Sequence, residues 1–550
     1  MISFVLVILI LIWFAGVLFR IYRQAHFYQI EEYQSSRYIR WLFEKRNRWL
    51  PARPVVVWFV GTSFSVMLAE APGSIFPGVI GIIAAIVAVW PAKRGEVKKP
   101  FRRTQRVSRI LGTAFVFTSI LALLVGLVNF LLLNDQMPAL RFGFAGAAGL
   151  LSFILAPLIL ILSNIVMQPV EAVSRRRFLN NARRVLHDVQ PTVIGITGSY
   201  GKTSTKVYLA QILSGRYRTL PTPKSYNTLM GVSMVINDTL AYDYSIEYFI
   251  VEMGAYIPGE IAEICDLTHP HIAVIIDVGP QHLERFGSIE QTAIAKYELI
   301  QALPPNGVGV FNWDSPHVRE MYERGYPQTR IAVSRQVSPD DVPEDGPRFI
   351  ASDIQQTLDG LTFTVTDTAT RETELFITTL LGEHTVTNIL LATAVAIHEK
   401  MSLQEVARMV RLLQPAESRL VRQVTAQGIT IINDAYSANP VGAANALRVL
   451  GLHRGGKRLL ITPGIVELGD LMEAENRKLG EVAAQHVTDV ILVGQEQTQP
   501  IQSGLVNAGF PKERIIVVDL LAESITWYQQ HLKPGDAVLF LNDLPDTYHQ

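Results

Sequence analysis

The chain has 550 residues, more than one ordinary domain uses, and 49% of them are hydrophobic. Its 49 basic residues balance 49 acidic ones, but this zero net charge averages two unlike parts of the chain and says little about partners. The single cysteine, Cys265, excludes an internal disulfide framework and a cysteine-based zinc cluster, and it fits a reducing compartment.

Apolar residues are concentrated in the first third of the chain. Five segments there are long enough to cross a bilayer, at about 2–19, 54–70, 74–90, 110–133 and 142–167. The second and third are short and joined by Glu70–Gly73, so a re-entrant hairpin is an alternative to two spans. A cleaved signal peptide is not expected, because no basic region precedes the first segment.

Basic residues are unevenly distributed among the loops between these segments. They gather in 20–53, 93–109 and 175–184, whereas the other two loops carry only Glu70, Asp135 and Arg141. The positive-inside rule therefore predicts a multi-pass membrane protein, with its N-terminus outside and everything after about residue 170 in the cytoplasm. The apolar segments hold almost no ionisable residues, which favours anchoring over transport. We expect the basic loops to contact the lipid bilayer rather than nucleic acid.

After about residue 190, apolar strands alternate with amphipathic helices, which predicts an α/β domain with a mainly parallel sheet. An expected strand, 192–196, runs into a glycine-containing segment, Thr197–Ser204, and then into an expected helix, 205–214. Backbone N–H groups in such a loop point into one concavity, where the helix N-terminus favours anions. Gly198 and Gly201 would let the backbone approach a phosphate. We expect Lys202 to reach the β- and γ-phosphates and Thr203 to bind Mg²⁺, in a loop of the short form G-x-x-G-K-[ST].

Seven further motifs follow this phosphate loop. The complete series is Thr-Gly-Ser-Tyr-Gly-Lys-Thr at 197–203, Ser-Tyr-Asn-Thr at 225–228, Val-Glu-Met-Gly-Ala at 251–255, Gly-Pro-Gln-His-Leu-Glu-Arg-Phe-Gly-Ser at 279–288, Ala-Lys-Tyr-Glu-Leu-Ile at 295–300, Gly-Glu-His-Thr-Val-Thr-Asn at 382–388, Ser-Arg-Leu at 418–420 and Asn-Asp-Ala-Tyr-Ser-Ala-Asn-Pro at 433–440. Together and in this order they resemble the Mur ligases, in particular the D-alanyl-D-alanine-adding (MurF) type, over about residues 190–500.

The resemblance implies ATP and Mg²⁺ as cofactors and an acyl-phosphate route to an amide bond. Glu252 follows an expected strand, 248–251, at the edge where parallel sheets bind ligands, so we expect it to share one metal ion with Thr203. Resemblance implies that His282 also contacts metal. It implies too that Lys296, on an expected helix 289–303, is carbamylated and binds a second Mg²⁺. The expected catalytic residues are thus Lys202, Glu252, His282 and Lys296, and the metal ligands are Thr203, Glu252, His282 and Lys296.

The same resemblance implies the nucleotide contacts. Asn388 and His384 are expected in a turn before a helix, 389–399, near the base. Asp434, after an expected strand 429–432, would contact the ribose or hold the domain interface, and Arg419 would meet phosphate or carboxylate where the domains close. The predicted cofactor-binding residues are Gly198, Ser199, Gly201, Lys202, Thr203, Ser204, Asn388, Arg419 and Asp434.

The sequence therefore predicts four regions: a membrane region of about five helices at 1–170, a basic linker at 171–189, a Mur ligase central ATP-binding domain with a phosphate loop at 190–410, and a smaller α/β C-terminal domain at 411–550. The UDP-sugar domain of the family has no counterpart, because the membrane region occupies its place. Ser418, Asp277 and Thr385 replace residues usual in the family, and Phe540–Asp543 replaces a Lys-Gly-Ser-type stretch.

These features predict a membrane-anchored, ATP-dependent peptide ligase acting on a cell-wall precursor that carries a carboxylate, with D-Ala-D-Ala as one candidate amine. One alternative is a related ligase with another amine donor, of the polyglutamate or amidating type. Another is a catalytically inactive nucleotide-binding scaffold for cell-wall synthesis. The altered C-terminal region favours the scaffold, while Lys202, Glu252, His282 and Lys296 argue against it.

Overall fold

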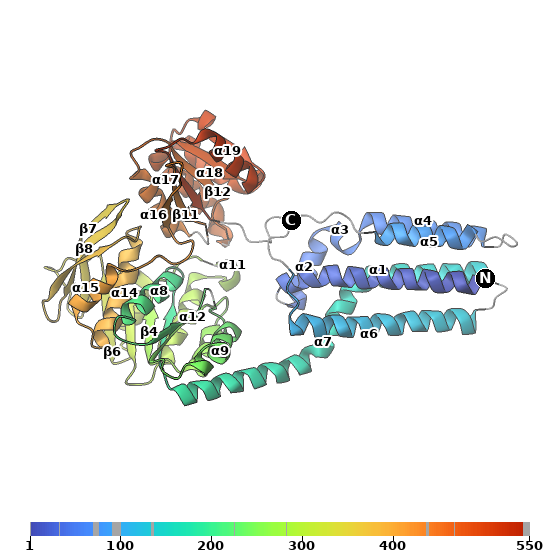
Figure 1. The fold of residues 1–550 in the computed structure, drawn as a ribbon, viewed down its shortest axis with the longest axis horizontal. Coiled ribbons are helices and arrows are strands. Elements are labelled where there is room, and N and C mark those ends of the chain that lie inside the picture. Colours follow the sequence, from blue (N-terminus) through green and yellow to red (C-terminus); the bar gives the residue numbers. More distant parts are fainter. Residues whose placement is uncertain are drawn as a thin grey trace. The chain divides into compact units, whose positions relative to one another are not determined.

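The computed structural model describes residues 2–31, 33–69, 76–90, 101–133, 137–224, 226–281, 283–435, 439–466 and 468–542. The chain divides into two compact units, one running from the N-terminus to Arg176 and the other starting at Arg177. Each unit is described by itself (Figure 1).

The first unit is helical. Its helices are α1 (Ile2–Ile30), α2 (Ser35–Glu44), α3 (Arg46–Trp49), α4 (Ala52–Leu68), α5 (Phe76–Val89), α6 (Gln105–Leu127) with the π-helical turn η1 (Val128–Leu132), and the first part of α7 (Pro138–Val189). Three stretches in the described residues, Ser3–Ile30, Gln105–Leu131 and Pro138–Val189, are long and apolar enough to cross a membrane.

The second and third predicted spans correspond to the shorter apolar helices α4 and α5. These two helices pack closely on each other: a Cβ added at Gly61 would lie only 2.0 Å from the Cβ of Ala84. Their close packing fits either two short spans or a hairpin, and the Glu70–Gly73 connection lies outside the described residues. Both alternatives therefore stay predictions.

Arg20 lies inside the helical unit, although the sequence places it in a basic loop. The reason is that α1 continues to Ile30, well past the expected end of the first span at 19. Only 6% of Arg20 is exposed. Its guanidinium donates to the carbonyls of Phe153 and Trp49, each at 2.8 Å, and lies 4.6 Å from the centre of the Phe153 ring. Arg20 thus joins α1 to α7 and to the last residue of α3.

The segment 171–189, expected as a basic linker, is the continuation of α7. Its last turns belong to the second unit, where Ala182 is fully buried. The Asn181 amide donates to Asn237 Oδ1 at 2.9 Å, and the Asn237 amide donates to the Phe178 carbonyl at 3.1 Å. These contacts fix the end of α7 against α9 (Leu229–Asp238).

The second unit begins with a nine-stranded sheet of order β2-β3-β1-β4-β5-β6-β7-β8-β9. Strands β2 to β7 pair in parallel, and β7, β8 and β9 pair antiparallel. The strands are β1 (Thr192–Thr197), β2 (Thr219–Pro221), β3 (Tyr248–Glu252), β4 (Ile272–Ile275), β5 (Val308–Asn312), β6 (Thr329–Ser334), β7 (Phe349–Thr357), β8 (Gly360–Asp367) and β9 (Thr373–Thr378). The predicted, mainly parallel α/β sheet is confirmed.

Helices cover both faces of this sheet, so its central strands are apolar throughout. Alternate residues of β3 point to opposite sides: Ile250 packs into the core formed with α8 and α14, whereas Phe249 and Val251 pack into the core formed with α9, α10 and α12. The helices are α8 (Lys202–Leu213), α9, α10 (Glu260–Thr268), α11 (Leu283–Phe286), α12 (Ile289–Gln301), α13 (Pro316–Glu323), α14 (His384–His398) and α15 (Leu403–Val410), with the 3₁₀ turn η2 (Leu240–Tyr242). Cys265 of α10 is buried, with its Sγ 3.7 Å from Met253 Sδ.

A second α/β domain follows from β10. Its six-stranded sheet has the order β10-β11-β15-β12-β13-β14, and every pair is parallel except β10–β11. The elements are β10 (Val421–Val424), β11 (Thr430–Asp434), α16 (Pro440–Gly451), β12 (Arg458–Thr462), η3 (Gly469–Leu471), α17 (Met472–His486), β13 (Asp489–Val493), α18 (Gln495–Asn507), η4 (Lys512–Arg514), β14 (Ile515–Val518), α19 (Leu521–His531) and β15 (Ala537–Leu541).

Candidate functional site

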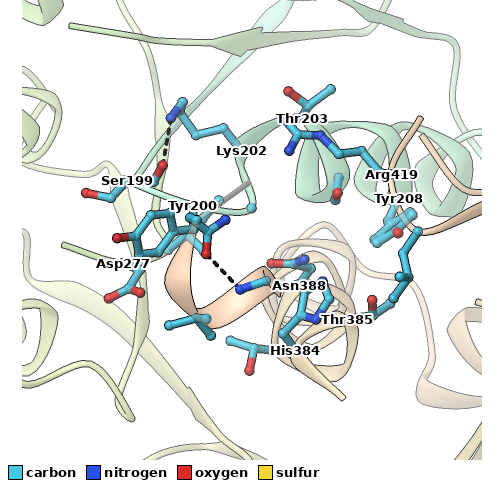
Figure 2. A pocket seen from close by; sticks show the side chains of 18 of the residues that line it. Ser199, Tyr200, Lys202, Thr203, Tyr208, Asp277, His384, Thr385, Asn388 and Arg419 are labelled. Carbon is cyan, nitrogen blue, oxygen red and sulfur yellow. Dashed lines mark hydrogen bonds between the residues drawn. The ribbon is translucent and has the colours of Figure 1, made fainter. Parts of the chain in front are cut away.

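A cavity of about 410 Å³ lies where β1, β3 and β4 end, the edge at which open parallel sheets bind ligands. Residues from the phosphate loop, from α14 and from the first part of the C-terminal domain line it. Figure 2 shows Lys202, Thr203 and Arg419 on one side and His384, Thr385 and Asn388 of α14 on the other. The lining includes Ser199, Gly201, Lys202, Thr203, Ser204, Asn227, Glu252, Asp277, His384, Asn388, Arg419 and Asp434.

The phosphate loop turns tightly between β1 and α8. Gly201, which directly precedes α8, has a φ of +77° in the left-handed region, and a Cβ there would lie 2.6 Å from Asn388 Oδ1. Glycine is thus required both by the backbone and by the approach of α14. The Lys202 ammonium donates to the loop carbonyls of Gly198 at 2.6 Å and Ser199 at 3.3 Å. Figure 2 shows the bond to Ser199.

Burial lowers the pKa of Lys202 to about 8, with Glu252 opposing the shift and Arg419 adding to it. Ser199 holds the neighbouring loop in place, because its hydroxyl accepts from Gly279 N at 2.9 Å and donates to Gly279 O at 3.0 Å. The loop therefore combines a cation with the amide groups at the start of α8, an arrangement suited to phosphate.

Glu252 is the carboxylate at the centre of the cavity wall. Its Oε2 accepts from the Thr203 hydroxyl at 3.0 Å and from the Lys206 ammonium at 2.9 Å, and its Oε1 accepts from the Asn227 amide at 3.2 Å. Because Thr203 donates its proton to Glu252, the hydroxyl lone pairs remain available to a cation. A carboxylate and a hydroxyl are the oxygen ligands that Mg²⁺ prefers.

Within the residues that the structure describes, no three or more His, Cys, Asp or Glu side chains form a group that could hold a metal ion. A cation at Thr203 and Glu252 would therefore take most of its ligands from phosphate oxygens and water, as Mg²⁺ commonly does. His282, predicted as a further ligand, lies outside the described residues. So do Ser225 and residues 436–438 of the predicted motifs.

Lys296 is a buried lysine on α12, with 4% of its surface exposed. Its pKa lies well below the ordinary value, first because of burial and second because of the nearby Lys202 charge, with Asp277 opposing. Both effects favour the uncharged amine, and Lys296 is not among the residues that line the cavity. Asp277 accepts from Ser315 at 2.6 Å and from Val278 N at 2.8 Å.

His384 and Asn388 lie in the first turns of α14, and the prediction that they occupy a turn before the helix was wrong. The helix begins at His384, two residues after Gly382 with its φ of +84°. Buried β-branched residues such as Thr385 have a low helix propensity, so the sequence did not indicate that the helix begins there. Asn388 Oδ1 accepts from Thr205 at 3.2 Å, which joins α14 to α8. Burial lowers the pKa of His384 to about 4, so its ring is neutral.

The C-terminal domain contributes Arg419 and Asp434. Asp434 ends β11, and its Oδ1 accepts from Leu420 N at 3.2 Å. Burial raises the pKa of Asp434 to about 6, with Arg419 opposing. Ser418 and Leu420 on either side of Arg419 have φ values of +55° and +47°, so the chain turns sharply where the second domain begins. The Arg419 charge acts on Lys202, Tyr208 and His384 as well, which places it facing the loop.

The cavity thus brings together Ser199, Gly201, Lys202, Thr203, Ser204, Glu252, Asn388, Arg419 and Asp434 of the predicted site. Gly198 accepts from Lys202 beneath it. Sequence reasoning missed Asn227 and Lys206, which both bind Glu252. Asn227 stands inside the Ser-Tyr-Asn-Thr motif, so the motif signalled it. Lys206 carries no such signal beyond its place one helical turn after Thr203.

Comparisons with known proteins agree with this geometry. Residues 196–396 match the Mur ligase middle domain, and residues 418–542 match the Mur ligase glutamate ligase domain. The UDP-N-acetylmuramoyl-tripeptide–D-alanyl-D-alanine ligase of Mycobacterium leprae is 33% identical, with 63% of this chain and 70% of that protein covered. The enzyme of the same name from Escherichia coli is 32% identical, covering 64% and 74%.

Among solved structures, MurF from Acinetobacter baumannii superposes with a TM-score of 0.57 at 26% identity, over 67% of this chain and 77% of that one. Both domains beyond the helical unit are therefore accounted for by one family. The chain belongs to the Mur ligase family of ATP-dependent ligases.

Proposed function

We propose that the chain uses ATP and Mg²⁺ to join the carboxylate of a muramoyl-peptide cell-wall precursor to an amine, with D-Ala-D-Ala as the first candidate. The observation that carries the proposal is the Thr203–Glu252 pair, hydrogen-bonded at 3.0 Å in the same cavity as the Lys202 loop. The names of the relatives from Mycobacterium leprae and Escherichia coli support the choice of amine.

The proposed chemistry begins with phosphoryl transfer. A carboxylate oxygen of the acceptor attacks the γ-phosphorus of ATP, the bond to the β-γ bridging oxygen breaks, and ADP leaves. The amine then attacks the acyl carbon, phosphate departs, and the nitrogen loses a proton. Such transfer depends mainly on positioning and on neutralising negative charge. Lys202 and the N-terminus of α8 supply positive charge at the phosphates, and bound Mg²⁺ would add to it.

The remaining residues take the roles that their positions support. Thr203 and Glu252 would hold the first cation and His282 would add a ligand. Gly198, Ser199, Gly201 and Ser204 would surround the phosphates, Asn388 would lie toward the nucleoside, and Asp434 and Arg419 would meet the nucleotide from the C-terminal domain. An uncharged Lys296 amine is the form that reacts with carbon dioxide, so burial favours a carbamate there. That carbamate would supply a ligand for a second Mg²⁺.

Membrane anchoring is part of the proposal. The three long apolar helices support insertion into the bacterial inner membrane. The basic loops support an N-terminus outside and ligase domains in the cytoplasm, where ATP is available. The match to the Mur ligase middle domain begins at residue 196, so it gives no indication of the domain that holds the UDP-sugar in the family. Two acceptors are therefore candidates, a UDP-linked precursor and a lipid-linked one in the same membrane.

The test is phosphate release from ATP by the full chain in detergent. UDP-linked muropeptide, lipid-linked muropeptide and free peptide are each supplied with and without D-Ala-D-Ala, and the product is identified by mass. Release that requires one acceptor together with the amine supports the proposal and identifies the substrate. Lys202→Ala should remove this release. ATP binding without release for any pair would contradict a ligase and favour the scaffold.

A further inference from the structure

Lys206 is a buried lysine in the candidate site to which the proposed reaction gives no role. It lies on α8, one turn after Thr203, and its side chain is 1% exposed. Its ammonium donates to Glu252 Oε2 at 2.9 Å and to the backbone carbonyl of Lys224 at 2.6 Å. Lys206 is not among the residues that line the cavity, whereas its partner Glu252 is, so it would act on a ligand through Glu252.

The contacts around Glu252 fix the direction of its carboxylate. Two donors, Thr203 and Lys206, occupy Oε2, while Asn227 is the one donor to Oε1 among the described residues. A carboxylate offers about four lone-pair positions, so one position remains, and it is on Oε1. Rotating the group would break the contact with Lys206 or the contact with Asn227. The carboxylate is therefore held with Oε1 available to the cavity.

Charge gives the second reason for a lysine at this position. The Glu252 side chain is 2% exposed, and an ionised carboxylate that deep is strongly disfavoured unless a cation is paired with it. The other nearby cation, Lys202, donates its hydrogen bonds to the loop carbonyls of Gly198 and Ser199. Lys206 is thus the counter-ion in direct contact with Glu252 among the described residues.

We propose that Lys206 is a positioning residue that pairs with the buried Glu252 carboxylate and directs it toward the divalent cation of the nucleotide. This inference rests on the proposed nucleotide and metal site and extends it. It predicts that Lys206 affects nucleotide binding only when the cation is present. A lysine that served the fold alone would affect binding in both conditions.

The experiment measures ADP binding by the full chain in detergent, by titration calorimetry, once with excess EDTA and once with Mg²⁺. For Lys206→Met we expect ADP to bind without metal as it binds to the wild type. In the presence of Mg²⁺ we expect ADP binding to be weakened at least about tenfold, because the variant lacks one charged hydrogen-bond donor to Glu252. Mg²⁺-ADP binding as tight as in the wild type, or tighter, would overturn the proposal. So would an equal loss in both conditions.

Arg348→Met is the matched control. Arg348 pairs with Asp367 at 2.7 Å in the same domain, and neither residue is among those that line the cavity. Its loss should lower the unfolding temperature and leave the Mg²⁺ enhancement of ADP binding intact. If Lys206→Met does not fold, Lys206→Gln retains a donor for the Lys224 carbonyl without the charge. That variant should also lose Mg²⁺ enhancement selectively.

The wild type separates the two proposals. If its ADP affinity does not change when Mg²⁺ is added, the proposed metal site itself fails, and the role of Lys206 fails with it. If Mg²⁺ tightens binding equally in the wild type and in Lys206→Met, the metal site stands and only the assignment of Lys206 is wrong.

Discussion

Lys296 lies on a helix, as the sequence predicted, but its side chain is buried. A lysine in the middle of an ordinary surface helix would be charged, yet here burial and the neighbouring Lys202 lower its pKa well below the ordinary value. A lowered pKa increases the share of unprotonated amine, whose free lone pair is what attack on carbon dioxide requires. The proposed carbamate is therefore supported by the electrostatics of this position.

Lys296→Ala should reduce ligase turnover strongly, because it removes the atom that would carry the carbamate. Added acetate or another short carboxylate should restore part of the turnover by occupying the space left behind. The measurement is phosphate release at increasing carboxylate concentration. Lys478→Ala, on an exposed position of α17, serves as the control and should show no carboxylate dependence. Lack of rescue in Lys296→Ala would contradict the carbamate.

Asp434 gives a prediction about pH. Burial raises its pKa from 3.8 to about 6, so the folded chain holds this proton more tightly than the unfolded chain. The stability that this contributes is fully present below about pH 4 and is lost as pH rises through about 6. Asp434→Asn should remove that dependence and be more stable than wild type at neutral pH, by at most about 3 kcal/mol.

The check is thermal unfolding of both proteins between pH 4.5 and 7.5. The difference between their midpoints should grow up to about pH 6 and level off above it. Curves that stay parallel at all pH values would show that Asp434 does not titrate there.

At the scale of single residues, the sequence predicted most of the side chains that line the cavity but not all the contacts between them. The motifs placed Lys202, Thr203, Glu252, Asn388, Arg419 and Asp434, and the structure brings these side chains to one cavity. The partnership of Lys206 with Glu252 depends on how far α8 is rotated about its axis relative to β3. That rotation is decided by packing of the two cores against the sheet, which no local pattern contains.

At the scale of elements, the phosphate loop requires glycine at position 201. Gly201→Ala would force a left-handed backbone on alanine and place its Cβ 2.6 Å from Asn388 Oδ1. We expect loss of ADP binding by at least about a hundredfold, since the loop backbone is strained and the Asn388 side chain must move out of its contact with α8. Calorimetric titration with Mg²⁺-ADP measures it.

Gly509→Ala is the control for backbone strain alone. Gly509 also has a positive φ, +80°, but a Cβ there would meet no atom within 4 Å. It should lower stability by about 1 kcal/mol and leave ADP binding unchanged. Equal binding losses in the two variants would show that the contact with Asn388 is unimportant.

Element boundaries were predicted less well than element types. The strand before the phosphate loop was expected at 192–196 and is found at Thr192–Thr197, because its buried apolar run is unmistakable. The helices α1 and α7 extend well beyond their apolar parts, to Ile30 and Val189. Apolar length predicts how much of a helix fits a bilayer, whereas the helix itself continues until a turn residue or a new packing partner ends it.

For the whole molecule, the division after Arg176 predicts that the ligase part is separable. A fragment starting at Arg175 retains the turns of α7 that pack on α9 through Asn181 and Phe178. We expect it to be soluble without detergent and to bind Mg²⁺-ADP with the affinity of the full chain. A shorter fragment starting at Thr192 lacks these contacts and should unfold at a lower temperature.

Sedimentation of the expressed proteins tests whether the helical unit anchors the full chain in the membrane. The full chain should remain with the membrane fraction after alkaline washing, while the fragment from Arg175 should stay in the supernatant. A full chain released by the wash would contradict insertion of the three long apolar helices.

The lone cysteine has a practical consequence. Because Cys265 of α10 is buried against Met253, thiol-reactive dyes should leave the natural protein unlabelled. Any cysteine introduced one at a time into the arginine-rich loops then becomes a clean chemical marker. Impermeant maleimides applied to intact and opened cells would report directly which side of the bilayer each loop faces.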